Sequence, residues 1–94
     1  MRQRWSAQAI EDRLGIFDYI ASDSGHAALE VDEAIEARVN ALLAMPRSGR
    51  PGRLANTREA VIGGTPYIVV YKVSDAELHV IRVLHSAQQW PPAR

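Results

Sequence analysis

The chain has 94 residues, a formal net charge of zero with 11 basic and 11 acidic side chains, and no cysteine. This length predicts one domain over residues 1–94, and the lack of cysteine excludes a disulfide framework and a thiolate metal site. The three scattered histidines do not favour a metal, and no cofactor is expected. The polar start is unlike a signal peptide and no apolar run approaches the roughly 20 residues of a membrane span, so we expect a cytoplasmic protein without membrane contact.

The charges are unevenly distributed along the chain. Residues 1–46 carry four arginines against eight acidic side chains, whereas residues 47–94 carry seven basic side chains against three acidic ones. Ten of the eleven basic residues are arginine, whose planar guanidinium suits bidentate contacts with carboxylate or phosphate. Either an acidic helical surface lies beside an ordinary basic sheet, or the C-terminal half meets an anionic partner.

The first half predicts a short strand followed by a helical hairpin. Residues 2–5 are predicted as the strand, with Trp5 facing inward, and Ser6 is placed to cap the helix that follows. The first helix is expected to cover a sheet with an apolar stripe at Ile10, Leu14, Phe17 and Ala21, widened by Ile16 and Ile20. The second helix has its stripe at Ala28, Val31, Ile35, Val39 and Leu42, and Pro46 ends it. The short link at residues 22–25 predicts an antiparallel pair.

The second half predicts a connector and three antiparallel strands. Residues 47–53, rich in glycine, proline and arginine, are predicted as a loop, and the strands are predicted over 57–62, 65–73 and 78–84. The central strand is apolar on both faces, and alternation places Ile68, Val70 and Lys72 opposite Tyr67. The fold class is therefore α+β, in the order β-α-α-β-β-β, with the helical hairpin on one face of a mostly antiparallel sheet. The other face is expected to be left for a partner.

Several segments in this order resemble the RelE/ParE family of bacterial type II toxin–antitoxin toxins. The segments are Asp18–Ala21, Pro46–Gly52, Thr57–Ile62, Gly64–Tyr71, Arg82–His85 and Gln89–Pro91. The resemblance implies a growth-arresting toxin that a cognate antitoxin neutralises, with operator DNA contacted through the antitoxin. An antitoxin helix could cover the open sheet face, an antitoxin strand could extend the sheet edge, or the segment could occupy the groove between the helical hairpin and the sheet. The residues expected to bind it are Ile68, Val70, Lys72 and Arg58. A homodimer through the same patch is the alternative.

The family contains both messenger-RNA nucleases that act on the ribosome and poisons of DNA gyrase, and the fold alone does not choose between them. A metal-independent nuclease would use His85, Arg82 and Tyr67 as its catalytic groups. Ile68 stands where RelE-like members often carry a basic residue that binds phosphate. These members also have a cluster of basic and tyrosine residues near the C-terminus, and Ser86–Gln89 provides few such residues. Both differences count against a nuclease. The sequences of Gly64–Tyr71 and Arg82–His85 are more similar to those of the ParE branch, so we favour a gyrase poison that acts by binding. A degenerate toxin that only binds its antitoxin and represses the operon is a third possibility.

The same residues also have plainer structural interpretations. His85 is interpreted first as a strand-end histidine bonded to the backbone. Arg47, Arg50 and Arg53 could contact nucleic acid or the target, and Trp90 could stack on a base. We favour a solvated connector, with one arginine paired to an acid of the second helix, and a Trp90 that folds back over the edge of the core.

Overall fold

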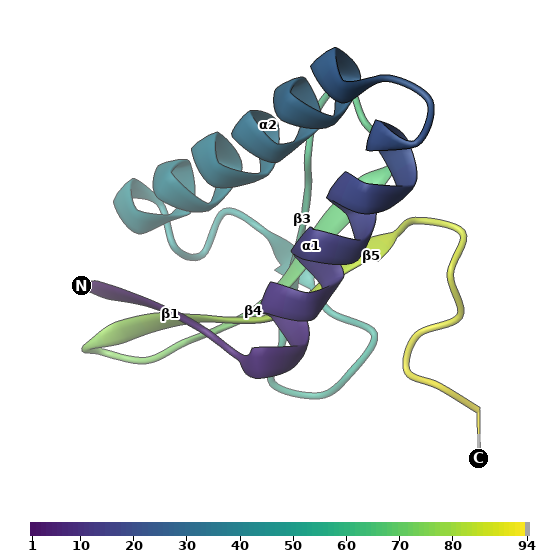
Figure 1. The fold of residues 1–94 in the computed structure, drawn as a ribbon. Coiled ribbons are helices and arrows are strands. Elements are labelled where there is room, and N and C mark those ends of the chain that lie inside the picture. The colour runs from purple at the N-terminus through teal and green to yellow at the C-terminus, as the bar shows by residue number, and fades with distance from the viewer. Residues whose placement is uncertain (94) are drawn as a thin grey trace.

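A computed structural model describes residues 1–93 of the chain. These residues form two helices and one five-stranded sheet, shown in Figure 1. The elements are β1 (Arg2–Trp5), α1 (Ala7–Ala21), α2 (Gly25–Ala44), β2 (Arg50–Pro51), β3 (Arg58–Val61), β4 (Tyr67–Val73) and β5 (Glu77–His85). The strand order is β1-β5-β4-β3-β2; β1 runs parallel to β5, and all other neighbours are antiparallel. The predicted fold class is confirmed.

Both helices begin at a serine whose hydroxyl caps the first turn. Ser6 Oγ accepts a hydrogen bond from the Ala9 backbone N–H at 3.0 Å, and Ser24 Oγ accepts one from Ala27 at 3.1 Å. Each bond satisfies a backbone donor that has no partner inside the helix. α2 ends one residue before Met45 because the ring of Pro46 disfavours helical geometry at that position.

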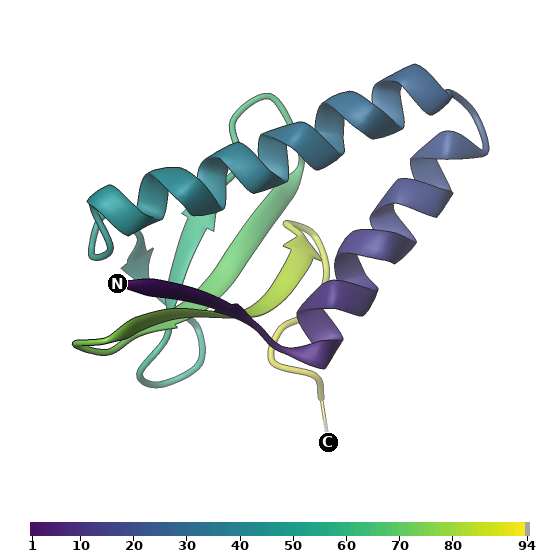
Figure 2. The ribbon, with the colours of Figure 1, turned by 60° about the vertical axis from the view of Figure 1, so that its left-hand side comes forward.

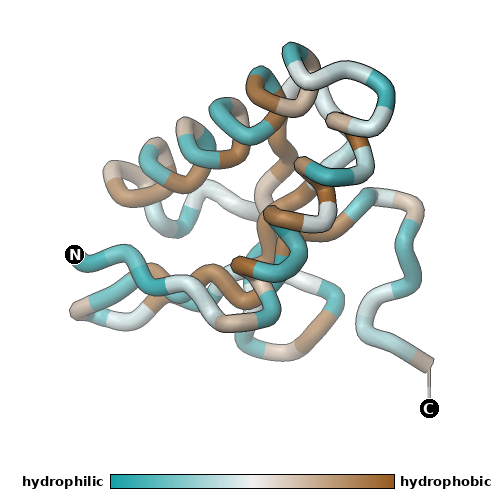
Figure 3. Tube along the Cα trace, viewed as in Figure 1, coloured by the Kyte–Doolittle hydropathy of each residue, from teal (hydrophilic) through white to brown (hydrophobic). Residues whose placement is uncertain are grey.

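α2 covers one face of the sheet, as the periodicity of its sequence predicts. Ile35, Val39 and Leu42 are completely buried and pack in one cluster with Val69 and Tyr71 of β4. Figure 2 shows α2 lying across the strands, and in Figure 3 hydrophobic segments recur along it at regular intervals. Burying these aliphatic side chains is the main source of stability in a domain of this size.

The predicted orientation of α1 is wrong. Ile10 and Leu14 were expected to face the sheet, but they are 49% and 60% exposed. α1 lies at the edge of the sheet, beside α2 and β5, rather than flat on the strands (Figure 2). The side that faces the core therefore carries Ala9, Ile16 and Ile20 instead. Periodicity predicts one broad apolar stripe on this helix, and only the structure shows that its Ile16 and Ile20 side is the one that packs against the core.

The predicted loop at residues 47–53 contains a strand that the sequence analysis missed. Arg50 and Pro51 form β2, which pairs with Glu59 and Arg58 of β3. A two-residue strand that contains proline lies at an edge of the sheet, where proline's missing N–H is tolerated. The turn after β3 contains Gly64 at φ 75°, a backbone conformation that other residues rarely adopt.

The expectation of an open second sheet face is also wrong. Ile68, Val70 and Leu84 on that face are 2%, 0% and 1% exposed, and Trp90 from the C-terminal tail packs against them. The tail turns back after β5, where the Gln88 N–H donates to the His85 carbonyl at 2.9 Å. The preferred interpretation of Trp90 as a side chain folded onto the core is confirmed.

Among residues 1–93, neither helix has the length and hydrophobicity needed to cross a bilayer.

Candidate functional site

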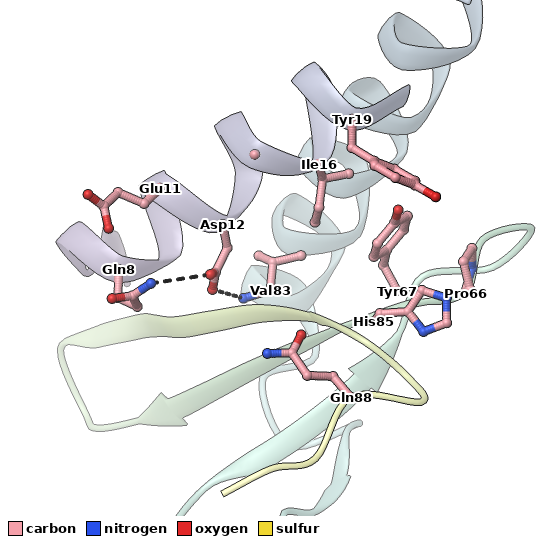
Figure 4. A pocket seen from close by; sticks show the side chains of 11 residues that line it. Gln8, Glu11, Asp12, Ile16, Tyr19, Pro66, Tyr67, Val83, His85 and Gln88 are labelled. Carbon is pink, nitrogen blue, oxygen red and sulfur yellow. Dashed lines mark hydrogen bonds between the residues drawn. The ribbon is translucent and has the colours of Figure 1, made fainter. Parts of the chain in front are cut away.

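A pocket of about 550 Å³ lies between α1, the start of β4 and the end of β5 (Figure 4). Its lining residues are Gln8, Glu11, Asp12, Gly15, Ile16, Tyr19, Pro66, Tyr67, Val83, His85 and Gln88. The Tyr67 and His85 rings meet edge to face, with centroids 5.6 Å apart and planes at 84°. Two of the three predicted catalytic residues therefore share one pocket.

The His85 imidazole is held by the backbone. Its Nδ1 accepts a hydrogen bond from the Ala87 N–H at 3.1 Å. The neutral ring that makes this contact carries its proton on Nε2, which can act as a donor. The interpretation of His85 as a strand-end histidine bonded to the backbone agrees with this geometry.

Arg82 is occupied by a carboxylate rather than free for phosphate. Its Nε and terminal nitrogen donate to Asp12 at 2.7 and 3.0 Å, and the Val83 N–H donates to the same carboxylate at 3.0 Å. The hydrogen bond with Asp12 raises the pKa of Arg82 despite the opposing effect of burial. The guanidinium also lies 5.3 Å from the centroid of the Trp90 ring. Arg82 on β5 therefore contacts both Asp12 of α1 and Trp90 of the C-terminal tail.

Tyr67 keeps its proton. Burial and the nearby Tyr19 raise the pKa of the Tyr67 hydroxyl above its ordinary value. A phenol in that state can donate a hydrogen bond but does not act as a base near neutral pH. Tyr67 and Arg82 are therefore both hydrogen-bond donors in this arrangement.

The arginines of residues 47–58 mostly stabilise the fold. Arg50 and Arg53 pair with Glu59 at 3.3 and 3.2 Å, and the Arg53 backbone N–H also donates to this carboxylate at 2.8 Å. Burial alone would raise the pKa of Glu59, but these hydrogen bonds lower it. The acid that holds the loop therefore lies on β3, and the predicted partner on the second helix is wrong. Arg58 donates to the backbone carbonyls of Arg47 and Gly49.

A second, more apolar pocket of about 540 Å³ lies where α1 meets β1 and α2. Its lining residues are Trp5, Ile10, Arg13, Leu14, Phe17 and Asp32. Arg13 donates to Asp32 at 2.6 and 3.0 Å, which lowers the pKa of that carboxyl, and its guanidinium lies 5.3 Å from the Trp5 ring centroid. The sequence analysis missed this site because it placed Ile10, Leu14 and Phe17 against the sheet. We name Ile10, Leu14 and Phe17 the outer stripe.

Within residues 1–93, no group of three or more histidine, aspartate or glutamate side chains is placed to bind a metal ion. Of the predicted antitoxin-binding residues, Lys72 is exposed, Arg58 is bound to backbone carbonyls, and Ile68 and Val70 lie under Trp90. Arg47 is exposed.

Comparison with known proteins identifies the class to which this fold belongs. Residues 4–90 match the family model described as the ParE toxin of the type II toxin–antitoxin system parDE. The chain is 41% identical over 90 residues to "Putative toxin Y4kP" of Sinorhizobium fredii, a match that covers 96% of this chain and 93% of that protein. It is 32% identical to Toxin RelE2 of Caulobacter vibrioides, covering 89% of this chain and 93% of the relative.

Solved structures share the fold at lower identity. A chain of the chromosomal ParDE system from P. aeruginosa superposes with a TM-score of 0.82 at 24% identity, covering 90% of this chain and 95% of that one. YafQ from E. coli gives a TM-score of 0.58 at 17% identity, covering 92% and 93%. The molecule is a toxin of a type II toxin–antitoxin system. The chain belongs to the ParE toxin family, within the wider group of RelE/ParE toxins.

Proposed function

We propose that this toxin arrests growth by binding and poisoning DNA gyrase, and that it does not cleave RNA. The observation that supports this proposal is the state of the predicted catalytic groups. His85 Nδ1 accepts a backbone hydrogen bond, and Arg82 is bound in a bidentate pair to Asp12. RNA cleavage through a 2′-hydroxyl requires a proton acceptor and cations free to meet the developing phosphorane charge. Neither requirement is met by these residues in the arrangement described.

The second candidate is a metal-independent nuclease that acts on the ribosome, and the pocket shared by Tyr67 and His85 favours it. The two activities separate when the toxin is induced without its antitoxin. Gyrase poisoning predicts DNA-damage signalling and filamentation, whereas a nuclease predicts rapid arrest of translation with cut messages. Absence of any growth defect would instead support a degenerate toxin that acts only with its antitoxin as a repressor.

Substitution of His85 sharpens this test. His85→Ala should leave toxicity within a few-fold of the parent, because no proton transfer depends on the ring. Tyr67→Phe, which removes only the hydroxyl, should behave in the same way. Loss of a typical general base or acid lowers a rate about 10²- to 10⁴-fold. A fall of that size in either folded variant would refute the binding mechanism and favour the nuclease.

We further propose that the cognate antitoxin binds the outer stripe of α1 rather than Ile68 and Val70. The outer stripe lines a pocket, with Ile10 and Leu14 exposed and Phe17 partly buried, whereas Ile68 and Val70 are reached only if Trp90 moves away. An amphipathic antitoxin segment could lay its apolar face on Ile10, Leu14 and Phe17. The toxin would act in the cytoplasm, and operator DNA would be contacted through the antitoxin.

This surface can be tested with a matched pair of substitutions. Leu14→Asp places a charge in the outer stripe, and Val61→Asp places one on β3, where the valine is similarly exposed at 55% against 60% for Leu14. Leu14→Asp should weaken antitoxin binding at least tenfold by calorimetry while the toxin stays folded and toxic. Val61→Asp should bind like the parent. Equal binding by Leu14→Asp and the parent would exclude the outer stripe.

A further inference from the structure

Three basic side chains form a row across neighbouring strands, on the face of the sheet opposite α2. Arg4 of β1 pairs in register with His79 of β5, and His79 pairs with Lys72 of β4. Residues directly opposite each other on paired strands point to the same face, and Leu78 and Val80, on either side of His79, are buried in the core on the other face. The Arg4 guanidinium lies 3.4 Å from His79 Nδ1. We name Arg4, His79 and Lys72 the basic row.

The basic row carries more positive charge than its neighbours neutralise. Glu77 is shared between two arginines, at 3.1 Å from Arg4 and 3.8 Å from Arg2. Lys72 is exposed and forms no ion pair within 4.0 Å in the part of the chain that the structure describes. The other arginines of this sheet face, by contrast, are matched by Asp12 and Glu59. Arg4 and Lys72 therefore give this part of the sheet face a positive charge that Glu77 alone does not balance.

We infer that the basic row binds the phosphodiester backbone of a nucleic acid. Neighbouring strands lie about 4.8 Å apart, so an extended polyanion lying across β1, β5 and β4 would meet the three side chains in succession. Arginine and lysine contacts of this kind supply sequence-independent affinity. The inference goes beyond the proposed function, because poisoning gyrase does not in itself require the toxin to touch nucleic acid.

The surroundings of the basic row favour a phosphate backbone over an acidic protein segment. Protein interfaces gain most of their affinity from large apolar or aromatic side chains buried at the centre. Among residues 1–93, none of the exposed large apolar side chains belongs to β1, β4 or β5. The outer stripe lies on α1, which is part of the acidic half of the chain. The part of the sheet face around the basic row therefore carries charge without an exposed large apolar side chain, which suits phosphate contacts.

His79 provides a reporter inside the basic row. Burial and the charges of Arg4 and Lys72 lower the pKa of its imidazole, against the opposing effect of Glu77. A phosphate placed over the row would offset those two cations and stabilise the imidazolium. Nucleic-acid binding should therefore raise the pKa of His79, and binding should strengthen as the pH falls through that value.

The experiment uses fluorescence anisotropy with a labelled DNA duplex and a labelled single-stranded RNA of the same sequence, titrated with the full chain at several salt concentrations. Lys72→Gln should weaken binding several-fold and lower the slope of log affinity against log salt by about one, the change expected for one lost phosphate contact. Arg38→Gln is the matched control, since it removes the same charge from α2. It should change affinity less than twofold. The DNA and RNA measurements identify which backbone binds more tightly.

A second measurement does not depend on any variant. The pKa of His79, followed by NMR of the imidazole protons, should rise when either oligonucleotide is added to the unmodified protein. The inference is overturned if neither oligonucleotide binds at low salt, or if Arg38→Gln weakens binding as much as Lys72→Gln. It is also overturned if an acidic peptide raises the pKa of His79 while the oligonucleotides leave it unchanged.

Discussion

Arg82 and Asp12 join the last strand to the first helix through two hydrogen bonds of 2.7 and 3.0 Å between their side chains. The Asp12 and Arg82 side chains are only 10% and 18% exposed, so solvent screens the pair little. Because the Arg82 guanidinium also contacts Trp90, the pair connects α1 to the tail that covers the second sheet face. The contact therefore stabilises α1 and the tail together.

Removing the charge of Asp12 should destabilise the protein. Asp12→Asn keeps an oxygen for the Val83 N–H but leaves the Arg82 guanidinium without its carboxylate. The free energy of unfolding measured in urea should fall by about 2–4 kcal/mol, since breaking a largely buried pair leaves an uncompensated charge. Asp18→Asn, an exposed change on the same helix, should fall within about 0.5 kcal/mol of the parent. Equal stability of the two variants would show that the pair contributes nothing.

Trp90 should be needed to shield the second sheet face. Trp90→Ala exposes Ile68, Val70 and Leu84 and should lower the free energy of unfolding by about 1–3 kcal/mol, less than for a fully buried tryptophan because Trp90 is only partly buried. The variant should also bind more of an apolar dye such as ANS. Gln89→Ala, which changes the exposed residue before Trp90, is the control and should leave both the unfolding free energy and the dye binding unchanged. Unchanged dye binding would mean that other parts of the chain cover this face.

The hydroxyl of the buried Tyr71 should anchor the segment that follows α2. It donates to the Pro46 carbonyl at 2.8 Å and accepts from the Gly49 N–H at 3.0 Å. Tyr71→Phe removes both bonds and should cost about 1–3 kcal/mol of unfolding free energy.

Gly49→Ala should be destabilising as well, because a Cβ at this position would overlap the Tyr71 hydroxyl. Gly63→Ala is the control, since a Cβ there meets no atom within 4 Å. A neutral Gly49→Ala would contradict the close contact.

Acid should weaken the fold through Glu59 and Asp32. Both carboxyls have a pKa below their ordinary values of 4.5 and 3.8, because arginines donate hydrogen bonds to them. A lowered pKa in the folded state contributes stability that is present above the unfolded-state pKa and is lost as the pH falls through the folded-state value. Unfolding free energy should therefore decline below about pH 5. Glu59→Gln should be less stable than the parent at pH 7 and approach it as the pH falls; a constant difference would refute this role for Glu59.

Local sequence signals predicted the parts of this fold that depend on neighbouring residues. Ser6 as a helix cap, the stripe of Ile35, Val39 and Leu42, and the end of α2 before Pro46 are all found in the structure. Each depends on periodicity or backbone chemistry within a few residues. The alternation in β4 likewise places Tyr67 in the core cluster and Ile68 on the other face.

The features that the sequence did not reveal depend on distant contacts. The exposure of Leu14 follows from the position of α1 at the sheet edge, and the pairing of Glu59 with Arg50 and Arg53 requires β2 to form. Periodicity does not specify which side of a broad apolar stripe on a helix meets a neighbouring element. The pairing of Arg82 with Asp12, 70 residues away in the chain, is likewise fixed by tertiary structure, so the residues of the candidate site could be selected from sequence but not their roles.

The parallel pairing of β1 with β5 has a consequence for biosynthesis. Arg2–Trp5 is translated before every other helix and strand of this domain, yet its hydrogen-bonding neighbour is Glu77–Val80. The earliest strand must stay unpaired until almost all later elements have been translated, and a contact so distant in sequence slows folding. A nascent chain that lacks β5 cannot complete the sheet, so the folded toxin domain forms only after β5 has been translated.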